Sequence, residues 1–105
     1  MTQLRLVFHP GVEDDLASIY DHYEQFDSAL PSRLEARLDE QVERIEMLPD
    51  SGAFLFESYR RVLVKRFPYM LVYLVGGDRI DVLAVVGVRR DPAWIEATVA
   101  ERADD

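Results

Sequence analysis

The chain has 105 residues, about half of them apolar, which is enough for one hydrophobic core and too few for two domains. It has no cysteine and two histidines, His9 and His22, which excludes disulfides, thiolate chemistry and a histidine-rich metal site. The net charge of −8 argues against general nucleic-acid binding. No apolar run of membrane-spanning length and no signal-peptide pattern occur, so we expect a soluble, cytoplasmic protein without a cofactor.

The first predicted elements are a strand and two helices. Residues 4–8 alternate in the manner of a half-buried strand. Pro10 suits the first turn of a helix, which we expect to run from residue 11 to about Gln25 on one apolar stripe. A second amphipathic helix is predicted over 31–48. The short gap between the helices predicts an antiparallel helical hairpin.

The second half of the chain changes to strand patterns. After a loop that contains Phe54 and Phe56, we predict strands over 59–66, 68–75 and 80–88, followed by a short helix that begins at Asp91-Pro92. The predicted fold class is α+β, in the order β-α-α-β-β-β-α, with the helical hairpin on one face of a mainly antiparallel sheet. We expect residues 1–105 to form a single domain.

Basic residues concentrate in residues 59–90, which hold seven of them against two acids. Strand alternation puts Val62 and Val64 on one face, which we expect to meet the helices. Arg61 and Lys65 then stand on the opposite, open face, about 13 Å apart. Two interpretations are open: a site for an anion or acidic partner, or a solvated edge strand whose charges prevent aggregation.

Several short sequence motifs occur in a characteristic order along residues 4–97. They are Asp15-Leu16, Leu48-Pro49 with Gly52, Arg61, Tyr69-Met70-Leu71-Val72-Tyr73, Ile80, Leu83-Ala84-Val85 and Arg89-Arg90-Asp91-Pro92. In this order and spacing they resemble the RelE/ParE toxin superfamily, also called plasmid stabilisation proteins. The resemblance implies a toxin of a type II toxin–antitoxin module, inhibited by a cognate antitoxin encoded beside it. RelE-like members cut mRNA on the ribosome without a metal, and ParE-like members poison DNA gyrase.

The resemblance also implies a surface that binds the antitoxin or the target, with these candidate residues: Arg61, Leu63, Lys65, Arg66, Arg89, Arg90 and Trp94. In a RelE-like nuclease, Arg61, Lys65 and Arg89 would stabilise the charge of the transition state. Such nucleases usually carry a Tyr or His for proton transfer near the C-terminal helix, where this chain has Trp94. This departure favours a ParE-like inhibitor that acts on gyrase by protein contact, without a membrane partner and without tight binding of naked nucleic acid.

Two alternatives stay open at the level of sequence. The basic residues would also suit a ribosome-dependent mRNA endonuclease, so whether the protein is an enzyme is undecided. A module of the same fold that has lost toxicity and only binds its antitoxin would carry the same pattern. Trp94 has a structural interpretation as well, as a core residue that fastens the last helix.

Overall fold

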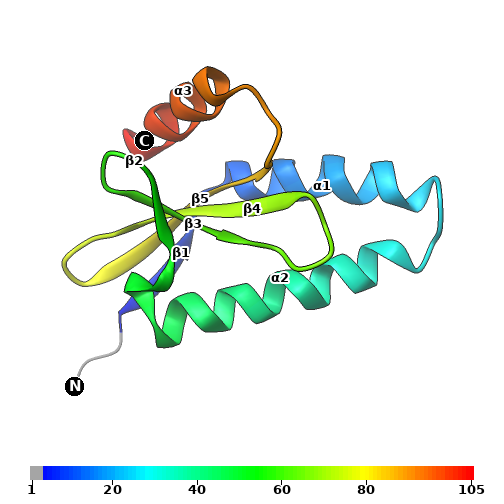
Figure 1. Ribbon diagram of the computed structural model, residues 1–105, viewed down its shortest axis with the longest axis horizontal. Helices are drawn as coiled ribbons and strands as arrows, with labels where there is room; N and C mark the ends of the chain where they lie inside the picture. The colour runs from blue at the N-terminus through cyan, green and yellow to red at the C-terminus, as the bar shows by residue number, and fades with distance from the viewer. Residues whose placement is uncertain (1–3) are drawn as a thin grey trace.

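The computed structural model describes residues 4–105, which form a five-stranded sheet with helices on both faces (Figure 1). The elements in chain order are β1 (Arg5–Phe8), α1 (Gly11–Glu24), α2 (Leu30–Met47), a short 3₁₀ helix η1 (Pro49–Ser51), β2 (Ala53–Phe56), β3 (Tyr59–Leu63), β4 (Tyr69–Val75), β5 (Arg79–Gly87) and α3 (Pro92–Ala103). The strand order is β1-β5-β4-β3-β2, with β1 parallel to β5 and the other neighbours antiparallel. The predicted α+β class and element order are confirmed, with β2 as an additional strand.

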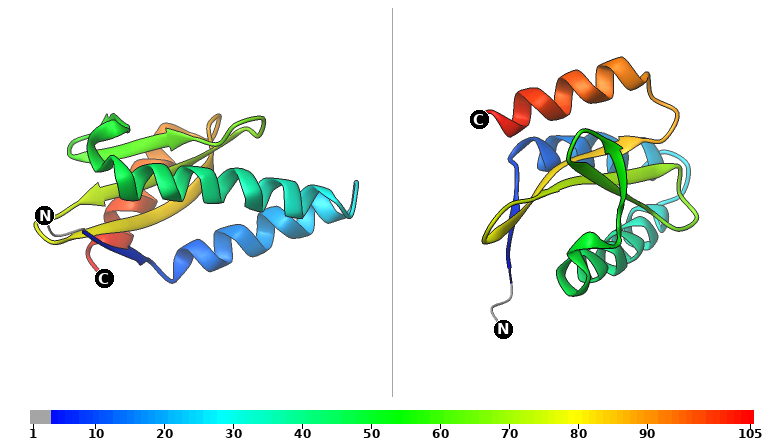
Figure 2. Two further views of the ribbon diagram at one scale, coloured as in Figure 1. Left: turned by 90° about the horizontal axis from the view of Figure 1, so that it is seen from below. Right: turned by 60° about the vertical axis from the view of Figure 1, so that its left-hand side comes forward.

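The helices α1 and α2 lie side by side across one face of the sheet (Figure 2). Their buried residues recur at helical spacing, and they pack on the strand residues of the same core: Val12, Ile19, Leu34, Leu38 and Ile45 against Val62, Val64, Leu71, Tyr73, Ile80, Val82 and Val85. Each fully buried Leu, Ile or Val contributes roughly 1.5–3 kcal/mol to the free energy of unfolding. The predicted orientation of Val62 and Val64 toward the helices is therefore confirmed.

The third helix, α3, packs on the other face of the sheet (Figures 1 and 2). It begins as predicted, because the Asp91 carboxylate accepts a hydrogen bond from the Ala93 N–H at 3.0 Å and Pro92 takes the first helical position. Ile95 and Val99 bury themselves against β4 and β5. The face that we expected to be open is thus partly covered. Among residues 4–105, no helix is both long and apolar enough to cross a membrane.

The strand predicted over 59–66 ends earlier, at Leu63. The Val64 N–H still bonds to the Tyr69 carbonyl at 2.9 Å, and the chain then turns toward β4 through Arg66, whose φ is 69°. Lys65 therefore lies in the turn and not in a strand, although it is exposed and still lines one hollow together with Arg61. Strand alternation alone does not show at which residue such a turn begins.

The segment that we predicted as a loop contains β2. It pairs with β3, and it is held by the Tyr73 hydroxyl, which donates to the Pro49 carbonyl at 2.7 Å and accepts from the Gly52 N–H at 3.0 Å. Arg60 donates from one nitrogen to the carbonyls of Asp50 and Gly52, at 3.1 and 2.8 Å. These bonds direct the chain from α2 into the edge of the sheet.

Candidate functional site

A groove of about 520 Å³ lies between α3 and the sheet face formed by β2, β3 and β4; we call it the sheet groove. Its lining is mostly apolar: Leu55, Phe56, Leu63, Met70, Val88, Pro92 and Ile95, with Arg61, Arg90 and Glu96 as its charged members. Leu63 is 52% exposed and Val88 is 41% exposed, so part of this apolar surface faces solvent. An exposed apolar groove with a few charges is typical of a surface that binds another protein.

Neighbouring arginines of β3 have different surroundings. Arg60 points toward η1 and β2, where its guanidinium lies 4.0 Å from the centre of the Phe54 ring and 3.7 Å from the Asp50 carboxylate. Arg61 points to the opposite side and makes no side-chain hydrogen bond or ion pair within residues 4–105. Arg60 is therefore structural, and Arg61 is available to a partner.

Arg90 and Trp94 form a stacked pair at the end of the sheet groove. The Arg90 guanidinium lies 3.8 Å from the centre of the Trp94 ring, a cation–π contact that holds both side chains at the surface. Trp94 is 39% exposed, which is high for a residue whose only role is to fasten a helix to the core. This pair presents a flat aromatic surface together with a positive charge.

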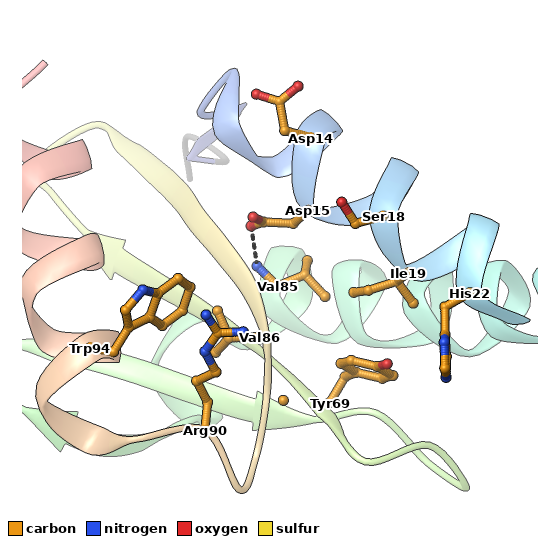
Figure 3. A pocket seen from close by; sticks show the side chains of 11 residues that line it. Asp14, Asp15, Ser18, Ile19, His22, Tyr69, Val85, Val86, Arg90 and Trp94 are labelled. Carbon is orange, nitrogen blue, oxygen red and sulfur yellow. Dashed lines mark hydrogen bonds between the residues drawn. The ribbon is translucent and has the colours of Figure 1, made fainter.

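A second hollow, of about 400 Å³, lies along the edge of β5 between α1 and α3, and Arg90 and Trp94 form one of its walls (Figure 3). Strand β1 pairs with β5 only as far as Val82, so the edge beyond it is uncovered. There, side chains bond to the backbone of β5 where a neighbouring strand is absent. Asp15 accepts from the Val85 N–H at 3.0 Å, and Arg102 donates to the Leu83 carbonyl at 2.9 Å.

The same two side chains bond to each other. Arg102 forms a two-pronged ion pair with Asp15, at 2.7 and 2.9 Å, and this hydrogen bonding raises the pKa of Arg102. The pair joins α1 on one face of the sheet to α3 on the other. Arg102 was not predicted from the sequence, because its partner lies 87 positions away and no local pattern signals such a contact.

The predicted site residues divide into two groups in the structure. Arg61, Leu63 and Arg90 line the sheet groove, and Trp94 joins them through its contact with Arg90. The remaining candidates do not line it: Lys65 and Arg66 lie in the β3–β4 turn, and Arg89 is exposed in the segment between β5 and α3. The three cations that a nuclease would use, Arg61, Lys65 and Arg89, are therefore not gathered in one groove.

Groups that could transfer a proton are sparse around Arg61. Of the residues that line the sheet groove, Glu96 is the only one with an ionisable side chain besides Arg61 and Arg90. Tyr59 lies close by in β3, but burial, followed by the charges of Glu57 and Asp104, raises its pKa. His9 pairs with Asp105 at 2.6 Å, well away from the groove lining.

The model of the family described as "ParE toxin of type II toxin-antitoxin system, parDE" matches residues 6–92. The chain belongs to the ParE toxin family. Two curated relatives, both named Toxin ParE2, come from Mycobacterium tuberculosis strains CDC 1551 / Oshkosh and ATCC 25618 / H37Rv. Each is 32% identical over 102 residues, covering 93% of this chain and 94% of the relative.

A solved structure described as the chromosomal ParDE TA system from P. aeruginosa has the same fold. Its TM-score is 0.72 at 22% identity, and the match covers 81% of this chain and 96% of that chain. The resemblance to the RelE/ParE superfamily, and to its ParE-like members, is confirmed. The family match extends from β1 to the first residue of α3, so it includes Arg61 and Arg90 and ends before Trp94 and Arg102.

Proposed function

We propose that this ParE-family protein inhibits growth by binding DNA gyrase and that a cognate antitoxin neutralises it, both in the cytoplasm. The observation that carries the proposal is the composition of the sheet groove, which combines seven apolar residues with Arg61 and Arg90. Such a surface suits a protein segment that has apolar and acidic side chains. Protein contact is therefore the activity that the groove supports best.

Cleavage of mRNA is the second candidate, and the unpaired Arg61 favours it. Cleavage requires a base that takes the proton of the 2′-hydroxyl and an acid that protonates the leaving oxygen. Glu96 would have to supply at least one of these functions, since no Tyr or His lines the groove in the described part of the chain. This chemistry usually requires two groups, an acid and a base with well-separated pKa values. The groove lining contains Glu96 as its one carboxylic side chain.

Induced expression of the chain in growing cells tests the proposal. We expect growth arrest with DNA-damage signalling and intact mRNA, relieved when the product of the adjacent gene is expressed with it. Arg61→Ala should weaken the arrest, and Arg5→Ala, on the far edge strand, should leave it unchanged. Cuts in translating mRNA that vanish in Arg61→Ala would support the nuclease instead, and growth without arrest would indicate a non-toxic, antitoxin-binding remnant.

A further inference from the structure

The hollow between α1 and α3 has two walls on either side of the edge of β5; we call it the β5-edge hollow. Figure 3 shows Arg90 and Trp94 on the side of α3, and Ser18 and Ile19 on α1 opposite them. Its volume of about 400 Å³ falls in the range of roughly 300–1,000 Å³ that is usual for pockets that bind small molecules. The hollow therefore has the size of a small-molecule site.

Two backbone groups of β5 face this hollow without a partner. The Val88 N–H bonds to the Pro68 carbonyl at 3.0 Å, so Gly87 and Val85, at the alternate positions of the antiparallel ladder, direct their N–H and C=O groups away from β4. On that side β1 pairs with β5 only as far as Val82. Within residues 4–105, the Val85 C=O and the Gly87 N–H have no hydrogen-bond partner. They present one acceptor and one donor side by side.

The free part of this edge is too short for a further strand. The outward-facing groups before it are bonded to the side chains of Asp15 and Arg102. The Gly87 C=O, which follows it, accepts from the Arg90 N–H at 3.1 Å. An added strand needs a longer run of free groups along the edge. The remaining pair suits a compact, planar group that carries a donor and an acceptor on neighbouring atoms.

The two walls are suited to the faces of such a planar group. A donor binds a carbonyl near the plane of the peptide, so a ring bonded to the edge of β5 lies near the plane of the sheet. Its faces then turn toward Ile19 of α1 and toward the stacked side chains of Arg90 and Trp94. Nucleobases stack on both indole rings and guanidinium planes. The hollow thus combines edge recognition with stacking.

Polar groups at the rim bear on what can be attached to the base. Asp14 and Ser18 are exposed on α1, where they can bond to the hydroxyl groups of a sugar. The charge of Asp14 and the net charge of −8 oppose a chain of phosphates, whereas Arg90 offsets a single one. These charges favour a nucleoside or its monophosphate over a triphosphate.

We infer that the β5-edge hollow binds the purine base of a nucleoside or nucleoside monophosphate, which donates to the Val85 C=O, accepts from the Gly87 N–H and stacks against Arg90 and Trp94. Adenine offers N6–H and N1 for these two bonds, and guanine offers N1–H and O6. The two fused rings of a purine also give a larger stacking area than a single-ring base. This site is separate from the sheet groove and does not depend on the proposed function.

Titration of the full toxin with adenosine and with guanosine tests the inference. Trp94 is the only tryptophan of the chain, so its fluorescence reports directly on this hollow. From the binding energy per atom that is usual for small ligands, we expect saturable quenching by at least one nucleoside with a Kd of about 0.1 mM. Hydrogen exchange of the Gly87 amide should slow in the complex, because the base accepts from this group.

One matched pair of variants and one altered ligand locate the base. Ser18→Tyr fills the hollow from an exposed position and should raise the Kd at least about tenfold. Ala17→Tyr, at the adjacent exposed position that does not line the hollow, should change it less than about twofold. N6,N6-dimethyladenosine and N1-methylguanosine lack the donor for the Val85 C=O and should each bind at least about tenfold more weakly than the parent nucleoside.

Three results would overturn the inference. The first is an absence of quenching by either nucleoside at about 10 mM, roughly a hundredfold above the expected Kd. The second is quenching that persists in Ser18→Tyr and leaves exchange of the Gly87 amide unchanged, which would place the base elsewhere. The third is a short single-stranded oligonucleotide that binds at least about tenfold more tightly than the nucleoside and depends equally on Ser18→Tyr, which would make the hollow a nucleic-acid site instead.

Discussion

At the scale of single residues, the contact between Asp15 and Arg102 joins two helices across the sheet. The side chains are 13% and 17% exposed, so both charges are largely removed from water. Gly11 makes room for this contact, because a Cβ at that position would lie 2.6 Å from the Arg102 guanidinium. Such a buried pair stabilises the fold only while both partners are present, because removing one leaves the other charge buried and unpaired.

Arg102→Met should therefore lower the free energy of unfolding by about 3 kcal/mol, because it leaves Asp15 buried without its cation. Urea denaturation measures this change. The double variant Asp15→Asn and Arg102→Met should lose less than Arg102→Met alone, since the amide oxygen still accepts from Val85 N–H and no charge stays buried. A double variant less stable than the single one would contradict this explanation.

At the scale of elements, β2 depends on the Tyr73 side chain of β4, which is fully buried. Tyr73→Phe removes the partner of the Pro49 carbonyl and of the Gly52 N–H. We expect a loss of about 1–3 kcal/mol in the free energy of unfolding, measured by denaturant titration. Tyr20→Phe, on the half-buried side of α1, serves as the control and should cost less than about 0.5 kcal/mol. Equal effects of the two changes would rule out a special role for the Tyr73 hydroxyl.

Tyr69 makes the contact between β4 and α1 sensitive to alkaline pH. Burial, and then the hydrogen bond and charge of Tyr23, raises the pKa of Tyr69 to about 12. Because the folded pKa exceeds the unfolded value of about 10, the stabilisation is complete below pH 10 and is lost as the pH rises toward 12. In Tyr69→Phe, the free energy of unfolding should decline less over this range. An identical decline in both proteins would show that other groups cause it.

The elements that sequence predicted well are those with long, regular patterns. The stripes of α1 and α2 and the alternation of Val62 and Val64 identified the helical hairpin and the buried face of β3. Strand β2 has four residues, and its position depends on bonds from Tyr73 and Arg60, which lie well beyond it in the chain. A pattern read along the sequence does not contain such contacts.

The candidate site was predicted in part for the same reason. Arg61 and Leu63 followed from strand alternation, and Arg90 followed from the resemblance. The turn that removes Lys65 from the strand depends on the backbone of Arg66.

At the scale of the whole molecule, charge is separated into acidic helix surfaces and a short basic region. The chain should therefore bind naked RNA weakly at physiological salt, because a few phosphate contacts are opposed by a net charge of −8. Filter binding with RNAs of unrelated sequence measures this affinity. Tight binding that is independent of sequence at about 0.15 M salt would contradict this expectation.

We propose that this ParE-family protein poisons gyrase by protein contact and that the antitoxin prevents it. The most direct measurement combines purified toxin with purified gyrase, DNA and ATP, and quantifies DNA breaks after the protein is denatured and digested. We predict that the toxin causes breaks to accumulate, that the product of the adjacent gene suppresses them, and that Arg61→Ala reduces them. Normal supercoiling without breaks at saturating toxin, together with Arg61-dependent cleavage of ribosome-bound mRNA, would contradict the account.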